Sequence, residues 1–333
     1  EWGSNARLGK GEWMVVEADE SDGTFIKLPT EIGIVTNIDP EHLDYFKTVE
    51  NMHREFETFF RNIPFYGLTV TCIDHPVVAE MVDRLKLRAD GRPLLTYGTT
   101  AGADLVLDDV RFDGQFTVFD ATLGARLKGG PRQLAGWRIP IPGQHNALNA
   151  LAAIAVAGEA GIADETIRSA IESFSGVKRR FQLTGTWNGI DIYDDYGHHP
   201  IEIAAVLKAA RPGAKGRVFA VVEPHRYTRV KSLFQEFSAC FADADAVIVA
   251  PLYAAGEPPL EGISSRSLAD GIRATGHPSA TAIDSPSDIA VLVRRYARPG
   301  DIVVCLGAGN STEWAHALPE QLAGEARVAG GTR

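Results

Sequence analysis

The residue types most suited to chemistry gather in the segment DDYGHHP at residues 194–200. It holds two carboxylates, a phenol and two imidazoles, between an apolar run at Ile190–Tyr193 and an apolar helical pattern that starts near Ile201. In an open α/β sheet, ligands bind beyond the carboxyl end of a strand. A helix cap followed by proline is the structural alternative, but it needs only one acid and leaves both histidines unexplained. We therefore interpret the segment as part of a functional site.

A second polar corner, PHRYTR at residues 224–229, follows the apolar run Arg217–Val222. Arg226 and Arg229 are three residues apart, so on a helix they present two guanidinium forks to a carboxylate or a phosphate. A solvated basic turn is the alternative. Another basic cluster, KRR at residues 178–180, offers the same chemistry to an anionic small molecule.

Acidic residues crowd the segment EADESD at residues 17–22, directly after the apolar Val15 and Val16. Such crowding is costly unless a cation neutralises it, and Mg²⁺ binds carboxylate oxygens together with substrate phosphates. Glu17, nearest the predicted strand, is the best candidate ligand. His42 follows the next predicted strand, so parallel pairing would bring it near Glu17. A solvated acidic loop and a capping histidine are the structural alternatives.

Two glycine-containing turns carry weaker signals. Gly143 precedes a helical pattern in which Asn146 and Asn149 share one face, which suits a base edge or a phosphate as well as an ordinary cap. The turn GAGN at residues 307–310 suits an anion at a helix start. On its own it is poor support for a dinucleotide site.

The composition indicates an ordinary globular protein of two domains. The chain has 333 residues, 45% hydrophobic and 23% charged, and a net charge of −10 that argues against a general nucleic-acid binder. Three widely spaced cysteines fit neither a zinc site nor a disulfide framework and suit a reducing compartment. Because the sequence holds no signal peptide and no long apolar run, we expect a soluble cytoplasmic protein with no membrane partner.

Short β-branched runs alternate with amphipathic helical patterns, which predicts an α/β fold with mainly parallel sheets. Strands are expected at Trp13–Ala18, Ile32–Ile38 and Leu68–Ile73, with a small antiparallel flank between Leu94 and Trp137. A second alternating series after Arg180 predicts a compact, doubly wound, Rossmann-like domain. The domain boundary is expected near residues 177–182.

The motifs occur in a specific order along the chain: GEWMVVEADESDGTF, TNIDPEHLDYF, GQHNALNALAAIAVA, GVKRRF, DDYGHHPIEI and EPHRYTR. In this combination, from about Glu12 to Ala317, the chain strongly resembles the Mur ligases. The resemblance implies that residues 1–181 form the central ATP-binding domain, without the phosphate loop that opens it. It also implies that residues 182–333 form a C-terminal Rossmann-like domain that binds the amino acid and closes on ATP.

The resemblance also implies roles for single residues. Glu17 and His42 are the implied ligands of Mg²⁺. The implied ATP-binding residues are His145, Asn146 and Asn149 on one helix. Arg180 would contact the ATP phosphates and Asp195 the ribose. The catalytic group around the amino acid and the sugar carboxylate is Tyr196, His198, His225, Arg226 and Arg229.

The reaction implied is ATP-dependent ligation of L-alanine to the lactyl carboxylate of UDP-N-acetylmuramate through an acyl phosphate, a step of peptidoglycan precursor synthesis. Two alternatives stay open. One is a recycling ligase that attaches a preformed tripeptide to the same sugar nucleotide. The other is a non-catalytic relative that binds the ligands only. The sequence does not indicate an oligomeric state.

A Gly-x-x-Gly-Lys-Thr type of phosphate loop does not occur in these 333 residues. Because the UDP-binding domain of the family would also precede Glu1, we expect the sequence to be truncated at its N-terminus. A phosphate loop supplies the backbone cradle, a lysine and one Mg²⁺ ligand. We therefore expect this chain alone to show no alanine-dependent ATP hydrolysis, and turnover above background with UDP-N-acetylmuramate would contradict this.

Overall fold

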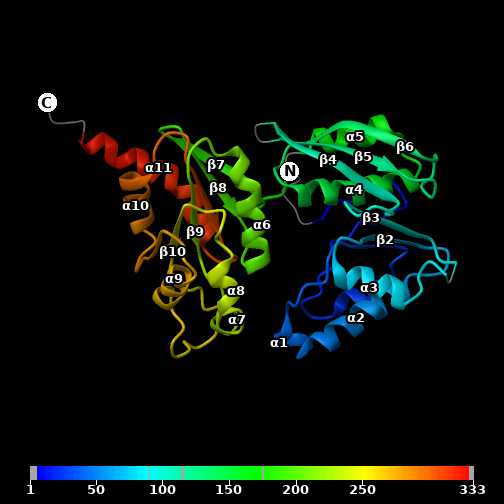
Figure 1. The fold of residues 1–333 in the computed structure, drawn as a ribbon, viewed down its shortest axis with the longest axis horizontal. Helices are drawn as coiled ribbons and strands as arrows, with labels where there is room; N and C mark the ends of the chain where they lie inside the picture. The colour runs from blue at the N-terminus through cyan, green and yellow to red at the C-terminus, as the bar shows by residue number, and fades with distance from the viewer. Residues whose placement is uncertain (1–5, 90, 114–115, 175, 330–333) are drawn as a thin grey trace. The chain divides into compact units, whose positions relative to one another are not determined.

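The computed structural model describes residues 6–89, 91–113, 116–174 and 176–329. The chain divides into two compact units, each with its own sheet (Figure 1). The N-terminal unit comprises residues 1–111, 117–139 and 145–175, and the C-terminal unit comprises residues 112–116, 140–144 and 176–333. The main division at residue 176 lies beside the expected boundary, whereas the functions assigned to the two domains stay predictions.

The N-terminal unit is built on a six-stranded sheet in the order β1-β2-β3-β4-β5-β6. The strands are β1 (Ile32–Val35), β2 (Leu68–Cys72), β3 (Leu94–Gly98), β4 (Leu105–Asp113), β5 (Phe116–Leu123) and β6 (Arg132–Ile139). Strands β1 to β4 pair in parallel, and β5 pairs with β6 in antiparallel fashion. The expected parallel sheet with an antiparallel flank is confirmed.

The helices of this unit bury aromatic and sulfur-containing side chains. They are η1 (Thr24–Lys27), α1 (Leu43–Phe46), α2 (Val49–Asn62), α3 (Pro76–Arg84), α4 (Gln144–Glu159) and α5 (Asp164–Glu172). Helix α2 begins after Thr48, whose side chain accepts a hydrogen bond from the amide of Asn51. Phe25, Phe59 and Met52 pack in one buried cluster.

The strand expected at Trp13–Ala18 does not form. Residues 13–20 are irregular, and the side chains of Met14 and Val15 are 85% and 96% exposed. A strand requires a neighbour to complete its backbone hydrogen bonds, and no described strand pairs with this segment. Strand β1 is accordingly an edge strand, with Ile34 exposed. The apolar composition of the segment was therefore a misleading signal.

The C-terminal unit has a six-stranded sheet in the order β11-β10-β9-β12-β8-β7. The strands are β7 (Gln182–Trp187), β8 (Ile190–Asp195), β9 (Val218–Val222), β10 (Ala246–Val249), β11 (Ala280–Ala282) and β12 (Ile302–Leu306). All neighbouring strands are parallel except β7, which pairs antiparallel with β8. Strand β12, last in the chain, is inserted between β8 and β9.

Two apolar clusters cover the two faces of this sheet. Along β9, Val218, Ala220 and Val222 belong to one cluster, while Phe219 and Val221 belong to the other. This alternation is what a strand buried on both faces requires. Helices α6 (Pro200–Ala210), α8 (Phe234–Ala239) and α9 (Ser265–Ala274) supply the first cluster, and α10 (Asp288–Tyr296) and α11 (Ser311–Ala329) supply the second. The doubly wound architecture is confirmed (Figure 1).

Three further features of the structure relate to the predictions made from the sequence: one helix, the cysteines and the lengths of the apolar helices. The helix expected at residues 230–242 is interrupted at Leu233, which separates α7 (Tyr227–Ser232) from α8. All three cysteines are free thiols, and Cys72 and Cys305 are buried. No helix within the described ranges is both long and apolar enough to cross a membrane.

Candidate active site

Three polar corners meet at one edge of the C-terminal sheet. In the ladder, Leu306 of β12 lies opposite Asp195 of β8 on one side and Val222 of β9 on the other. The segments that follow these strands, 194–200, 223–229 and 307–310, therefore leave the sheet side by side. This is the edge at which α/β folds of this kind bind ligands.

Asp195 organises the first corner. Its side chain is 2% exposed, and its two oxygens accept hydrogen bonds from the amides of Phe181 (2.8 Å) and Gly197 (2.7 Å). Burial raises the pKa of the carboxyl to about 6, against the opposing effect of these two amides. A Cβ atom at residue 197 would lie 2.9 Å from the Oδ1 atom of Asp195. The close approach therefore requires glycine at this position.

Asp194, on the opposite face of β8, is fully buried and is held by Arg179. The Nε atom of Arg179 lies 4.0 Å from the Oδ2 atom of Asp194, which also accepts a hydrogen bond from the Thr312 hydroxyl. Arg179 donates a further hydrogen bond of 2.6 Å to the carbonyl of Gly307. Arg179, which the sequence analysis named only as part of a basic cluster, thus joins β8 to the turn after β12.

Arg180 faces outward, unlike its neighbour. Its side chain is 51% exposed and lies 3.8 Å from the Oε1 atom of Glu202. The ring of Tyr196 lies beside both arginines, with the guanidinium of Arg179 at 4.7 Å and that of Arg180 at 5.8 Å from the ring centroid. The structure therefore separates the pair into a partly buried residue that binds other parts of the chain, Arg179, and one that is more exposed, Arg180.

The hydrogen-bond partners of His198 determine its tautomer. Its Nδ1 atom lies 3.0 Å from the carbonyl of Tyr196 and 3.4 Å from the Oε2 atom of Glu202. Both partners are acceptors, so Nδ1 must carry the hydrogen. The Nε2 atom of His198 is left with a lone pair and can accept a proton.

His225 has the opposite tautomer. Its Nδ1 atom lies 3.4 Å from a guanidinium nitrogen of Arg229, which can only donate. The hydrogen of the ring therefore sits on Nε2. The ring stacks on Tyr253 with centroids 5.3 Å apart, and its centroid lies 5.8 Å from that of His198. Two imidazoles with complementary roles, an acceptor and a donor, thus lie next to each other.

Both imidazoles are neutral at physiological pH. Burial is the main cause that lowers the pKa of His198 and that of His225, and the positive charge of Arg229 adds to it in both cases. The pKa of His225 falls to about 4. A neutral imidazole keeps the lone pair that a hydrogen-bond acceptor needs.

The depressed pKa of His225 predicts a pH dependence of folding stability. The unfolded chain binds a proton at this ring below about pH 6.5 and the folded protein only below about pH 4, so stability falls as the pH falls through this window. Between pH 7 and pH 5, we expect His225→Gln to lose about 1 kcal/mol less stability than the wild type, allowing for solvent screening of a half-buried ring. Urea unfolding at both pH values measures the difference. An equal loss in both proteins would contradict the expectation.

In the N-terminal unit, His42 lies within a group of acids. Its Nε2 atom is 3.4 Å from the Oε1 atom of Glu20 and 4.0 Å from the Oε2 atom of Glu41. One ligand atom from each of the three residues lies within 4.8 Å of the other two. The hydrogen bond with His42 lowers the pKa of the Glu20 carboxyl. Two carboxylates and an imidazole in this arrangement suit a hard divalent cation.

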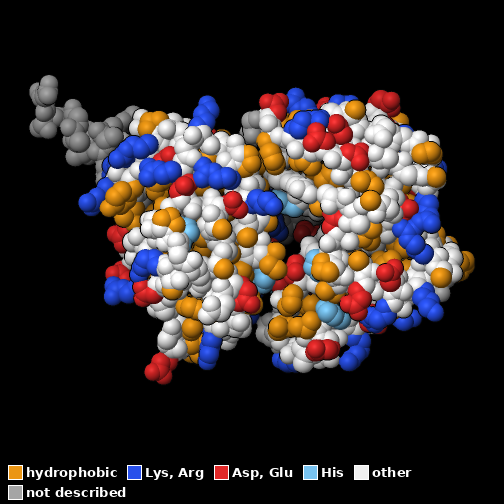
Figure 2. All heavy atoms as spheres, in the orientation of Figure 1, with side chains coloured by type: hydrophobic (Ala, Val, Ile, Leu, Met, Phe, Trp, Pro, Cys, Tyr) orange, Lys and Arg blue, Asp and Glu red, His pale blue; other side chains and the backbone are white. Residues whose placement is uncertain are grey.

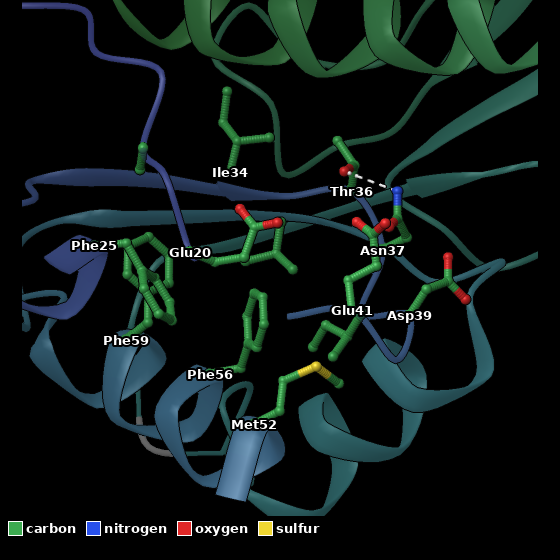
Figure 3. Close-up of a pocket in the computed structure, with 13 residues that line it drawn as sticks. Glu20, Phe25, Ile34, Thr36, Asn37, Asp39, Glu41, Met52, Phe56 and Phe59 are labelled. Carbon is green, nitrogen blue, oxygen red and sulfur yellow. Dashed lines mark hydrogen bonds between the residues drawn. The ribbon is translucent and has the colours of Figure 1, made fainter. Parts of the chain in front are cut away.

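Glu17 is not a member of this group. It lies in the exposed irregular segment before Ala18, and Glu20 is the acid of the 17–22 run that reaches His42. Sequence reasoning missed Glu20 and Glu41 as candidates because it relied on a strand that ended at Glu17. Figure 3 shows the carboxylates of Glu20 and Glu41 above Met52 and Phe56, in a pocket of about 210 Å³ that also includes Asp39.

Helix α4 carries the asparagines as the spacing predicted. It begins at Gln144, so Asn146 lies in its first turn and Asn149 one turn later on the same face. His145 and Asn149 are exposed, and Asn146 is partly exposed. Because α4 begins before both asparagines, neither of them is the N-cap residue of the helix. Their contact with ATP stays a prediction.

Left-handed backbone conformations accompany several of these residues. The φ angle is 54° at His42, 60° at Arg179, 46° at Phe181 and 66° at Arg226. Non-glycine residues adopt this region rarely, and they do so most often where a local geometry must be enforced. Positive φ angles also occur at Lys47, Lys86, Asn188 and Ala255 among the described residues, so this conformation alone does not mark the site.

Comparison with known proteins extends over nearly the whole chain. A family model described as the Mur ligase middle domain matches residues 5–157, and one described as the Mur ligase, glutamate ligase domain matches residues 179–309. UDP-N-acetylmuramate–L-alanine ligases of Mesorhizobium japonicum and Brucella anthropi are 55% and 56% identical to it over 322 residues. These alignments cover 97% of this chain and 68% of each relative.

Solved structures show the same fold. The UDP-N-acetylmuramate–alanine ligase of Thermotoga maritima superimposes with a TM-score of 0.71 at 22% identity, covering 92% of this chain and 63% of that one. The MurF ligase of the same organism, solved in complex with ADP, gives 0.66 at 20% identity, covering 91% and 65%. This chain thus spans about two thirds of the length of the proteins that it matches. With two family models matched in order and relatives above 50% identity, the chain belongs to the Mur ligase family.

Proposed function

We propose that the protein to which this chain belongs ligates L-alanine to the lactyl carboxylate of UDP-N-acetylmuramate at the expense of ATP. The observation that carries the proposal is the cluster of His198, His225 and Arg229, in which an acceptor imidazole, a donor imidazole and a guanidinium converge. This set matches a zwitterionic amino acid, which brings one ammonium and one carboxylate. Relatives with this name at 55–56% identity support the choice of alanine.

The nucleotide is assigned to the residues that the family resemblance indicates. Arg180 is placed at the ATP phosphates, Asn146 and Asn149 with His145 along helix α4, and Asp195 near the ribose. The exposure of Arg180 supports its role, because a phosphate needs an accessible guanidinium. Asp195 keeps acceptor capacity, since each of its oxygens accepts only one amide among the described contacts.

Magnesium is assigned to His42, with Glu20 and Glu41 beside it and with Glu17 as the ligand that the resemblance implies. The donor set fits, because carboxylate and imidazole atoms lie within 4.8 Å of one another. When bound, Mg²⁺ offsets the negative charge of the phosphates. Glu20, Glu41 and His42 would hold the ion.

For the amino acid, Arg226 and Arg229 are assigned to carboxylates, those of alanine and of the sugar. The Nε2 atom of His198 accepts a hydrogen bond from the ammonium group of alanine and takes one proton from it, which leaves the neutral amine that attacks the carbonyl carbon of the acyl phosphate. Glu202, 3.4 Å from Nδ1, stabilises the imidazolium that forms. The amine nitrogen then forms the amide bond and loses its second proton, and phosphate leaves with the electron pair of the broken carbon–oxygen bond and with that proton. Tyr196, beside His198, forms a wall of this site.

We place the reaction in the cytoplasm, where ATP and the sugar nucleotide are available, without a nucleic-acid or membrane partner. The mixed surface supports this view, since Figure 2 shows acidic and basic side chains interspersed on the face in view. A nucleic-acid binder would instead gather basic residues on one face.

Competition between substrates tests the proposal. With the full-length protein, ATP and UDP-N-acetylmuramate, we expect L-alanine to be ligated and a peptidoglycan tripeptide to be used at least 100-fold less efficiently. The reverse preference would identify the recycling ligase, and turnover with neither substrate would favour a binding protein without catalysis. Neither alternative is favoured by the names of the relatives.

A further inference from the structure

The glycine-containing turn before helix α11 holds an anion of the protein itself. Helix α11 begins at Ser311, and the amide of Ser311 donates a hydrogen bond of 3.1 Å to the Oε2 atom of Glu223. The amides of Gly309 and Asn310 also stabilise the charged form of this carboxyl, whereas its burial raises the pKa. The side chain of Glu223 is 2% exposed. The anion predicted from the sequence at this helix start is therefore a side chain of the protein, the Glu223 carboxylate.

The same arrangement recurs at the two other helices of this edge. At α6, Glu202 accepts hydrogen bonds from the amides of His198 (3.0 Å) and His199 (3.2 Å). At α7, Glu257 accepts one of 3.0 Å from the amide of Thr228. Helix N-termini attract anions in general. At these three helix starts, carboxylates of the chain accept hydrogen bonds from backbone amides.

Glu223 directly precedes the segment that carries His225 and Arg226. It directly follows β9, and its own amide donates to the carbonyl of Leu306 at 2.8 Å. The next residue, Pro224, accepts a hydrogen bond from the amide of Tyr253, and the amide of Arg226 donates to the carbonyl of Tyr253, both at 2.8 Å. The backbone on both sides of His225 is therefore hydrogen-bonded to Tyr253, and Glu223 itself is hydrogen-bonded to the end of β12.

Gly309 packs closely against both the Glu223 carboxylate and the Tyr253 ring. A Cβ atom at residue 309 would lie 2.6 Å from the Oε2 atom of Glu223 and 2.6 Å from the Cδ2 atom of Tyr253. Tyr253 in turn stacks on the ring of His225 with an interplanar angle of 9°. The turn before α11, the Glu223 carboxylate, Tyr253 and His225 thus form one continuous set of contacts.

We propose that Glu223 is a positioning residue: its carboxylate fixes the turn 307–311 to the end of β9 and so sets the orientation of His225 and Arg226 toward the amino acid. The kinetic part of this inference rests on the proposed function. The structural part, the coupling of the α11 turn to residues 225–229, stands on the contacts alone.

Three variants test the proposal in the full-length protein. Glu223→Ala removes the acceptor, Glu223→Gln keeps one acceptor oxygen of the same reach, and Glu261→Ala removes an exposed carboxylate of the same unit as a matched control. We expect Glu223→Ala to raise KM for L-alanine about tenfold with KM for ATP changed less than twofold. Glu223→Gln should restore most of the affinity, and Glu261→Ala should behave as the wild type.

Amide hydrogen exchange provides a readout that does not need turnover. In Glu223→Ala, exchange should become at least tenfold faster both at residues 309–311 and at residues 225–229, with the midpoint of thermal unfolding showing that the unit remains folded. Faster exchange confined to 309–311, or an unchanged KM for L-alanine in a folded and active variant, would overturn the proposal. If the wild type ligates no amino acid, the proposed function fails, and the exchange pattern still decides the coupling. If Glu223→Ala does not fold, KM for L-alanine and the amide exchange at residues 225–229 and 309–311 are compared between Glu223→Gln and Glu223→Leu. The same outcomes then support or overturn the proposal.

Discussion

Replacing His198 by glutamine is expected to lower kcat/KM for L-alanine by about 10²- to 10³-fold in the full-length protein, as loss of a general base does in other enzymes. The reason is the tautomer: the Tyr196 carbonyl holds the ring hydrogen on Nδ1, so Nε2 is the atom that can take a proton. Steady-state kinetics with varied L-alanine measures the effect. A general disturbance of the structure by the substitution would instead change KM for ATP as well.

His225→Gln is the matched comparison for this variant. Arg229 directs the hydrogen of His225 to Nε2, so this ring donates a hydrogen bond and does not accept a proton. A glutamine amide can still donate, and we expect a loss of only about tenfold. If His225→Gln proves more damaging than His198→Gln, the two roles are reversed and the tautomers are assigned wrongly.

Replacing Arg179 by methionine is expected to destabilise the C-terminal unit by about 3 kcal/mol, because a fully buried carboxylate would lose its cationic partner. The variant also loses the 2.6 Å hydrogen bond to the Gly307 carbonyl. Denaturant unfolding followed by a probe in the C-terminal unit measures the change, since two units need not unfold in a single step.

The neighbouring Arg180→Met provides the control. Arg180 is 51% exposed and its ion pair with Glu202 spans 3.8 Å, so we expect a loss of less than about 1 kcal/mol. Its effect should fall on KM for ATP, raised about tenfold or more in the full-length protein. Equal destabilisation by both variants would refute the division of the pair into an internal and a ligand-facing arginine.

The regular elements with strong periodicity could be predicted from the sequence. Helix α9 has the bounds that the sequence predicted, Ser265–Ala274, and strand β8 begins at Ile190 as expected. The strand β7 was missed because its residues, QLTGTW, are largely polar and form an edge. The three-residue strand β11 was too short to produce a pattern. Residues Trp13–Ala18 have the apolar pattern of a strand, but no described strand lies beside them to pair with.

The candidate site could be found from the sequence at the level of segments, but not at the level of atoms. The motif at residues 194–200 indicated two acids and two histidines. It could not indicate that Asp194 is buried against Arg179 while Asp195 binds two amides, because adjacent strand residues point to opposite faces. The tautomers of His198 and His225 depend on partners that only the fold supplies. Glu20 was overlooked because a loop, not a strand, carries it to His42.

The internal carboxylates at the helix starts have a consequence for product release. An anion tethered to the chain is present at an effective concentration far above that of a free ion. Inorganic phosphate, a product of the proposed reaction, therefore cannot compete for the amides that Glu223 occupies before helix α11. We expect phosphate inhibition of the wild type to depend on the ATP-binding residues, and Glu223→Ala to make the amides before helix α11 available to phosphate. The turn before helix α11 would then retain none of the phosphate that the reaction releases.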